Sequence, residues 1–177
     1  SLAATLSALC DLTPTHISVY GLQIEEGTYF ARHLDELDLP DEETERAMYM
    51  DTVAYLAKRG FDRYEISNFS QEGYPSRHNL KYWHREDYLG LGLAAHSCLG
   101  NTRFSNTENL EEYLLGNRQD TTQRISPHDI LCETVMLGMR LDEGVDFSTL
   151  TKRYGAEAVA IRDALDKFTK SGLVINN

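Results

Sequence analysis

The chain has 177 residues, of which 41% are hydrophobic and 25% charged, and its formal net charge is −11. This composition is typical of a folded globular protein with room for one domain, or for one and a half small ones. The acidic excess argues against a nucleic-acid-binding role, because release of counterions from nucleic acid requires clustered Lys and Arg. No stretch approaches the roughly twenty apolar residues of a membrane span.

The three cysteines, Cys10, Cys98 and Cys132, are widely spaced. Their odd number argues against a disulfide framework and favours a reducing compartment, so we expect a cytoplasmic protein. None has metal-site spacing, and we expect all three to be small buried hydrophobic residues. The chain starts at Ser1 rather than Met and ends in an apolar run, and we expect a fragment of a longer protein.

The first 70 residues alternate between helical and strand-like patterns, which is the rhythm of a parallel sheet or barrel. The second helix begins after Pro40, with Asp41 as its cap and acidic residues in its first turn, and ends at Gly60. The expected elements are a helix over 2–11, a strand over His16–Ile24, the helix that follows Asp41 and a strand over Phe61–Ser67.

The middle of the chain is rich in aromatic residues and glycine. Residues 70–86 read as a long, partly irregular loop, and a loop of this length inside a compact domain is usually functional or disordered. The sequence then predicts a strand over Tyr88–Leu93, a turn at 99–102 into a short strand near Arg103–Ser105, and a helix over Glu108–Leu115.

The last third reads as helical after a polar linker at Gly116–Arg124. Ser126 is a helix cap with a proline at the next position, and two more helices are expected over Phe147–Tyr154 and Ala156–Thr169. A strand closes the chain at 172–177. We therefore expect two domains, residues 1–117 and a small, truncated, winged-helix-like domain over 118–177.

His78 is the first candidate for binding chemistry. A neutral imidazole can ligate heme iron, Tyr82 and Trp83 can stack on a porphyrin, and Arg77 has the charge to pair with a propionate. The alternative is a surface or capping histidine whose neighbouring aromatics anchor the loop.

Two further polar residues lie at expected strand ends. His96 follows the small residues Gly90, Gly92, Ala94 and Ala95, which would let the backbone approach a cofactor closely. Its alternative role is that of a hydrogen-bonded core histidine in a tightly packed strand. Gln23 stands near the end of an earlier strand, and it is either a ligand contact or an ordinary polar residue.

Together these motifs resemble the heme-chaperone-like (HemW-like) branch of the oxygen-independent coproporphyrinogen-III oxidase family, whose members are radical S-adenosylmethionine (SAM) proteins. The resemblance is to the C-terminal half of these proteins and covers nearly the whole chain. The matching stretches are His16–Tyr20, Glu25–Thr28, Arg63–Phe69, Ser76–Trp83, Tyr88–Ser97, Met136–Leu141 and Glu143–Asp146.

The resemblance implies an α/β fold: the C-terminal part of a partial (β/α) radical SAM barrel followed by the small helical domain. It implies SAM and a [4Fe-4S] cluster as cofactors of the full-length protein. It also implies that a His-Asn-x-x-Tyr-Trp motif binds heme, here with His78 as the possible iron ligand. The implied site residues are His78, Asn79, Tyr82 and Trp83 for heme, and Gln23 and His96 for SAM.

The sequence departs from the family at the cluster, because the Cys-x-x-x-Cys-x-x-Cys loop is absent. We therefore expect this polypeptide alone to be inactive as a radical enzyme and to hold no tightly bound cofactor.

The leading hypothesis is part of a cytoplasmic heme chaperone with a heme-acceptor protein as partner. The first alternative is a coproporphyrinogen-III oxidase, and the second is a non-catalytic interaction module. The tail favours no nucleic-acid partner, since residues 126–177 hold six basic against eight acidic residues.

Overall fold

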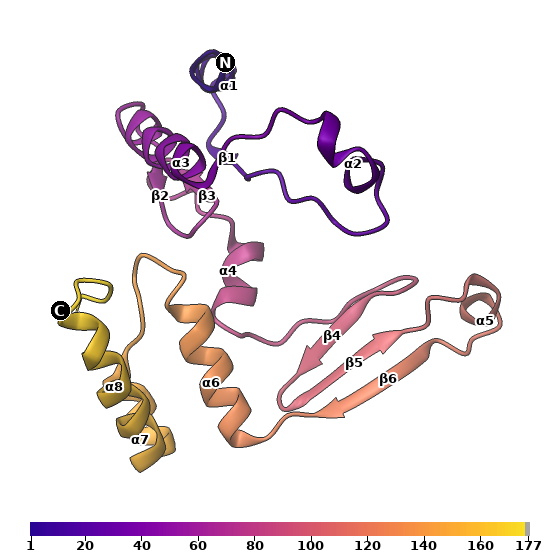
Figure 1. Cartoon of the computed structure of the whole chain (residues 1–177). Helices are drawn as coiled ribbons and strands as arrows, with labels where there is room; N and C mark the ends of the chain where they lie inside the picture. Colours follow the sequence, from indigo (N-terminus) through magenta and orange to yellow (C-terminus); the bar gives the residue numbers. More distant parts are fainter. Residues whose placement is uncertain (176–177) are drawn as a thin grey trace. The chain divides into compact units, whose positions relative to one another are not determined.

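The computed structural model describes residues 1–175, and the chain forms two compact units, residues 1–76 and 77–177. Figure 1 shows the elements of both. The first unit contains three α-helices, one short 3-10 helix and three short strands. These are α1 (Leu2–Asp11), β1 (His16–Ser18), α2 (Tyr29–Arg32), η1 (Leu34–Glu36), α3 (Glu42–Ala57), β2 (Asp62–Arg63) and β3 (Asn68–Ser70).

The core of the first unit lies where α1 and α3 pack on the small sheet. Its buried side chains are Leu6, Ile17, Leu56, Phe61 and Phe69. The predicted helix over 2–11 is confirmed. The predicted cap of α3 is also confirmed, because the Asp41 carboxylate accepts a hydrogen bond from the Thr44 backbone N–H at 2.8 Å.

The predicted parallel pairing is wrong for the first unit. Its sheet has the order β1-β3-β2 with both pairs antiparallel, and His16 and Asp62 both pair with Ser70. The chain reverses before β3 because the buried Glu65 carboxylate accepts hydrogen bonds from the Ser67 backbone and the Asn68 amide. This turn ends the strand predicted over Phe61–Ser67 after two residues.

The strand predicted over His16–Ile24 is also shorter than expected, since regular pairing ends at Ser18. Residues 20–23 are exposed, and a segment without a buried face has no packing to hold it in a sheet.

The second unit combines an antiparallel sheet with a group of helices. Strands β4, β5 and β6 pair in sequence order, and α5 lies in the connection from β5 to β6. The elements are α4 (Arg77–Trp83), β4 (His96–Leu99), β5 (Thr102–Asn106), α5 (Leu110–Leu114), β6 (Gln119–Arg124), α6 (Pro127–Gly138), α7 (Phe147–Tyr154) and α8 (Ala156–Thr169).

The helices α6 to α8 share a core formed by Leu131, Val135, Leu150 and Ala158. The predicted start of α6 is confirmed, because Ser126 Oγ accepts a hydrogen bond from the Asp129 backbone N–H at 3.1 Å. The predictions for α7 and α8 match the observed bounds. The turn into β5, the short strand β5 and the short helix α5 were also predicted, whereas β4 was not.

Three predictions for the second unit are wrong. The expected loop at 70–86 contains α4. The expected linker at Gly116–Arg124 contains β6, whose six residues are all exposed and so lack an alternating apolar pattern. The expected strand at Tyr88–Leu93 retains only one bridge, between Tyr88 and Cys98, because the following backbone turns through positive φ at Gly92.

The α/β class is confirmed, but the barrel is not seen. Within residues 1–175 all six strands pair antiparallel, and none of these helices is both long and apolar enough to cross a membrane. Residues 172–175 form no strand, and the rest of the predicted terminal strand lies outside the described residues. The winged-helix-like character and the domain boundary at 117/118 remain predictions.

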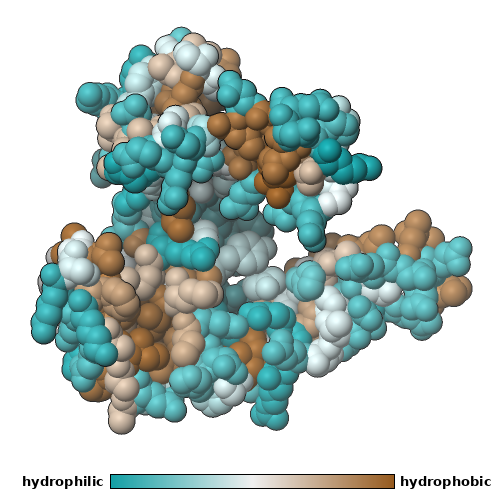
Figure 2. Space-filling view, viewed as in Figure 1, coloured by the Kyte–Doolittle hydropathy of each residue, from teal (hydrophilic) through white to brown (hydrophobic). Residues whose placement is uncertain are grey.

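Exposed leucines gather on α5, at the end of the β5–β6 pair remote from α6. Leu110, Leu114 and Leu115 are 57%, 75% and 80% exposed. Figure 2 shows hydrophobic residues, in brown, at this end of the sheet, whose visible surface is otherwise mostly hydrophilic. These three leucines are therefore apolar surface that the described residues leave largely open to solvent.

A very close backbone approach joins the glycine-rich segment to β4. A Cβ built on Gly90 would lie 2.2 Å from the His96 carbonyl oxygen, and the Gly90 N–H donates to Ser97 Oγ at 3.0 Å. Only a residue without a side chain fits there.

Gly90→Ala is expected to destabilise the second unit by about 1–3 kcal/mol, because the new methyl group must displace backbone. Gly21→Ala is the matched control, since a Cβ there meets nothing within 4 Å. Denaturant unfolding of both variants measures the difference. Equal denaturation midpoints for Gly90→Ala and the control would contradict this prediction, because they would show that β4 can move to accommodate the methyl group without loss of stability.

The second prediction concerns Asp146, which caps α7. Its carboxylate accepts hydrogen bonds from the Thr149 hydroxyl at 2.6 Å and from the Ser148 N–H at 2.8 Å. The hydrogen bond with the Thr149 side chain, followed by that with Ser148, lowers the pKa of Asp146 below its ordinary value of 3.8.

Asp146→Ala is therefore expected to lower the melting temperature at neutral pH. A carboxylate whose pKa is lowered by folding stabilises the fold above its unfolded pKa, and this stabilisation is lost as the pH falls toward the folded pKa. The gap in melting temperature between wild type and variant should thus be constant from about pH 7 to 5 and shrink below about pH 4. A gap that persists undiminished to about pH 3 would contradict this role.

Candidate functional site

The helix α4 carries all four residues of the candidate heme motif. Its 3.6-residue period places residues four apart on one stripe, so His78 and Tyr82 share one stripe while Asn79 and Trp83 share the next. The motif therefore has two faces, and the structure gives them different surroundings.

The first face is an exposed aromatic ladder. The His78 and Tyr82 rings lie 5.0 Å apart with an interplanar angle of 82°, and Tyr82 meets Tyr88 edge-on at 4.8 Å. Both motif residues of this face are exposed, Tyr82 by 40%. Tyr88 extends the ladder from the following segment, where its backbone pairs with Cys98. We refer to these three residues, His78, Tyr82 and Tyr88, as the aromatic ladder.

The second face turns toward the helical part of the unit. Trp83 is half-buried, and the Arg140 guanidinium lies 5.7 Å from the centre of its ring. Trp83 also lines an open pocket of about 280 Å³ together with residues of α6 and of the segment that leads into α7. Cation–π contact and partial burial give Trp83 an anchoring role.

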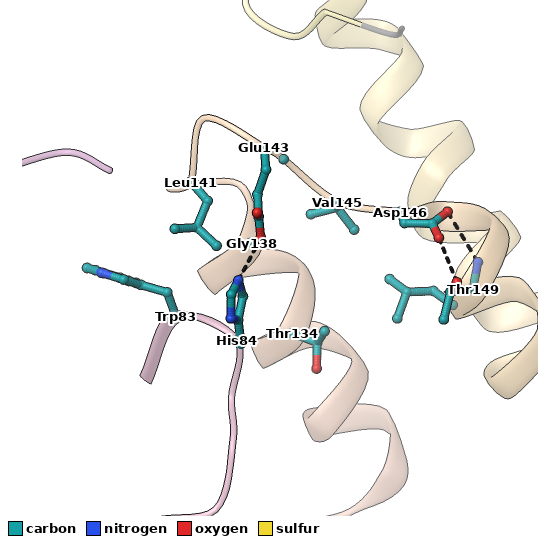
Figure 3. Close-up of a pocket in the computed structure, with 11 residues that line it drawn as sticks. Trp83, His84, Thr134, Gly138, Leu141, Glu143, Val145, Asp146 and Thr149 are labelled. Carbon is teal, nitrogen blue, oxygen red and sulfur yellow. Dashed lines mark hydrogen bonds and ion pairs between the residues drawn. The ribbon is translucent and has the colours of Figure 1, made fainter. Parts of the chain in front are cut away.

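His84 strengthens the same junction. Its Nε2 lies 2.6 Å from a carboxylate oxygen of Glu143, and Figure 3 shows this pair among the residues that line the pocket, with Trp83 beside it. The other pocket walls come from Gly138 and Leu141 and from Val145 and Leu150. The end of α4 is thus held to the helices by one aromatic and one polar contact.

An ion-pair network fixes the chain directly after α4. The Glu133 carboxylate on α6 accepts from Arg85 at 2.9 Å and from Arg103 of β5 at 3.1 Å. The Arg85 side chain is only 12% exposed, and its backbone has a φ of +55°, which a non-glycine residue adopts only when its surroundings impose it. The sequence reasoning missed this network, because its partners are as far as 48 positions apart.

The proposed SAM residues belong to different units. Gln23 is an exposed residue of the first unit, outside any strand, and His96 is an exposed residue at the start of β4 in the second. The alternative of His96 as a hydrogen-bonded core residue is wrong. The space that a side chain at Gly90 would occupy is filled by the His96 carbonyl group and the Ala95 side chain, rather than left open for a cofactor. The assignment of both residues to SAM remains a prediction.

The cysteines differ from the expectation of three buried residues. Cys98 is buried, Cys10 is partly buried and Cys132 is exposed on α6, with its sulfur 3.6 Å from His128 Nε2. In residues 1–175 no three His, Cys, Asp or Glu side chains gather as a metal site. This donor set does not fit a [4Fe-4S] cluster, which needs several thiolates around one centre.

Comparisons with known proteins agree with the resemblance. The family model "HemN C-terminal domain" matches residues 125–177. The heme chaperone HemW of Bacillus subtilis is 30% identical over 98% of this chain and 48% of its own length. HemW of Synechocystis is 35% identical over 88% of this chain and 40% of its own length. A mitochondrial radical S-adenosyl methionine domain-containing protein 1 of Danio rerio is 32% identical over 77% of this chain and 34% of its own length.

The fold matches a solved structure as well. Coproporphyrinogen III oxidase (HemN) from Escherichia coli, described as a radical SAM enzyme, superposes with a TM-score of 0.79 at 20% identity. The match covers 100% of this chain and 46% of that structure. The chain thus spans at most about half the length of these relatives. On these grounds the chain belongs to the HemW/HemN family and aligns with the C-terminal portion of its radical SAM proteins.

Proposed function

We propose that this chain is the C-terminal part of a radical SAM heme chaperone and that the exposed face of α4 binds heme. The observation that carries the proposal is the aromatic ladder, in which an accessible imidazole is followed by two tyrosine rings in contact. Relatives named heme chaperone, 30% and 35% identical to this chain, support the same function.

The ring geometry of the ladder suits a porphyrin. Iron bound to His78 would lie in the plane of the imidazole, so the porphyrin would be perpendicular to that plane. The Tyr82 ring is already inclined by 82° to the imidazole, an orientation compatible with stacking against the porphyrin. Among residues 1–175, the His78 ring makes no hydrogen bond, which leaves its nitrogens available for iron.

The two faces of α4 divide the motif into two roles. We assign heme contact to His78 and Tyr82. The contacts of Trp83 with Arg140 and the pocket support an anchoring role for Trp83, and Asn79, which shares its stripe, belongs to the same face. The motif residues would thus act as two pairs. His78 and Tyr82 would contact heme, and Asn79 and Trp83 would orient the helix that presents them.

The remaining parts of the proposal concern the full-length protein. Its [4Fe-4S] cluster would be held by residues outside this chain, and SAM would lie against Gln23 and His96. We propose a cytoplasmic protein with a heme-acceptor partner, although the vertebrate relatives are named mitochondrial. Residues 118–177 would form the small winged-helix-like domain.

The alternative function is that of an oxygen-independent coproporphyrinogen-III oxidase, which converts two propionates of its substrate to vinyl groups. The fold match with the Escherichia coli oxidase favours it. The relatives named heme chaperone, which align over 98% and 88% of this chain, weigh against it.

The iron-ligand role is tested by heme titration of the full-length protein. His78→Ala is expected to weaken heme binding at least about tenfold and to shift the Soret band, because an axial ligand is lost. His128→Ala is the control, since it removes another exposed histidine of the same unit. An unchanged titration for His78→Ala would remove His78 as the ligand.

The choice between chaperone and oxidase is tested with the reconstituted full-length protein. Incubation with coproporphyrinogen III and SAM is expected to yield no divinyl product, while heme-loaded protein should pass heme to an apo-acceptor in an absorbance assay. Clear turnover to the divinyl product would establish the oxidase instead.

A further inference from the structure

We infer that Arg77 and Lys81 form a carboxylate-binding pair beside the aromatic ladder, which selects tetrapyrroles with free propionates over their esters. The inference rests on the proposed function and adds to it the chemical class of the cargo.

The two cations lie on one stripe of α4. Arg77 is its first residue and Lys81 belongs to its last turn, so their four-residue spacing places them side by side along the helix. This stripe is the immediate neighbour of the one that carries His78 and Tyr82. Both side chains are exposed, and their long aliphatic stems give the charged ends a wide reach.

Neither cation is neutralised by a described part of the chain. The chain has 28 acidic against 17 basic residues, and several nearby cations are already engaged. Arg85 and Arg103 hold Glu133, and Arg140 covers Trp83. By contrast, the ion pairs within residues 1–175 include neither Arg77 nor Lys81. Two unpaired cations on adjacent turns of a helix in an acidic chain leave positive charge available for an anion.

The position of this charge matches the shape of the cargo. Heme carries two carboxylates on one edge, and that edge projects sideways from an iron held by His78 and a ring stacked on Tyr82. Cations on the adjacent stripe can meet this edge. The Arg77 guanidinium can bind one carboxylate through two parallel hydrogen bonds, and the Lys81 ammonium can act on the other as a point charge. Methyl esters of the same propionates would offer no charge to either group.

The experiment compares heme with heme dimethyl ester in titrations of the full-length protein. Wild type is expected to bind heme about tenfold more tightly than the ester, the effect of two exposed ion pairs. The double variant Arg77→Gln/Lys81→Gln should bind heme about as weakly as wild type binds the ester, so that its preference for heme falls to about one. Added salt should reduce the preference of wild type and leave the variant unchanged.

The matched control is Lys167→Gln/Lys170→Gln, which removes two exposed cations from the same unit and should leave the preference at the wild-type value. Equal binding of heme and ester by wild type would overturn the inference and leave the proposed function intact. A double variant that loses affinity for both ligands equally would also overturn it, because the loss would then be structural. Failure of wild type to bind either ligand would instead refute the proposed function.

Discussion

The Glu133 carboxylate joins the three segments on which the candidate site depends. It lies on α6, accepts from Arg85 just after α4, and accepts from Arg103 of the sheet. Arg85 is largely buried and one of its guanidinium nitrogens, Nη2, lacks a partner among residues 1–175, so loss of Glu133 would leave a buried charge uncompensated. A seven-residue helix is unstable alone, and this network supports α4 together with the contacts of Trp83 and His84.

A helix fixed in this way presents one face to solvent and keeps the other on its support. The anchoring face contains the larger aromatic ring of the motif. Trp83 can fill the space between α4 and the 139–146 segment and still meet the Arg140 guanidinium.

Local signals in the sequence predicted the longer helices well, but they missed the short helices α2 and α4 and most of the strand pairing. The caps at Asp41 and Ser126 and the apolar stripe of α8 act over three or four residues, so they are visible in any short window. Strand pairing is a long-range property. The reversal at Glu65 depends on a buried carboxylate and its hydrogen-bond donors. The strand β6 is exposed along its whole length. Neither feature produces the alternation of hydrophobic and polar residues by which strands are recognised in a sequence.

The candidate site illustrates the same limit at the scale of single residues. The identity of the motif residues is visible in the sequence, but the sequence predicts a loop over residues 70–86, in which four side chains can converge on one ligand. In α4 they cannot, because residues 78 and 79 are separated by about 100° around the axis. The helix therefore turns one apparent cluster into two pairs, and it also brings into the site Tyr88, a residue that had been assigned to a strand. The four-residue spacing of His78 and Tyr82, and of Asn79 and Trp83, is visible in the sequence and indicates this division of the motif into two pairs.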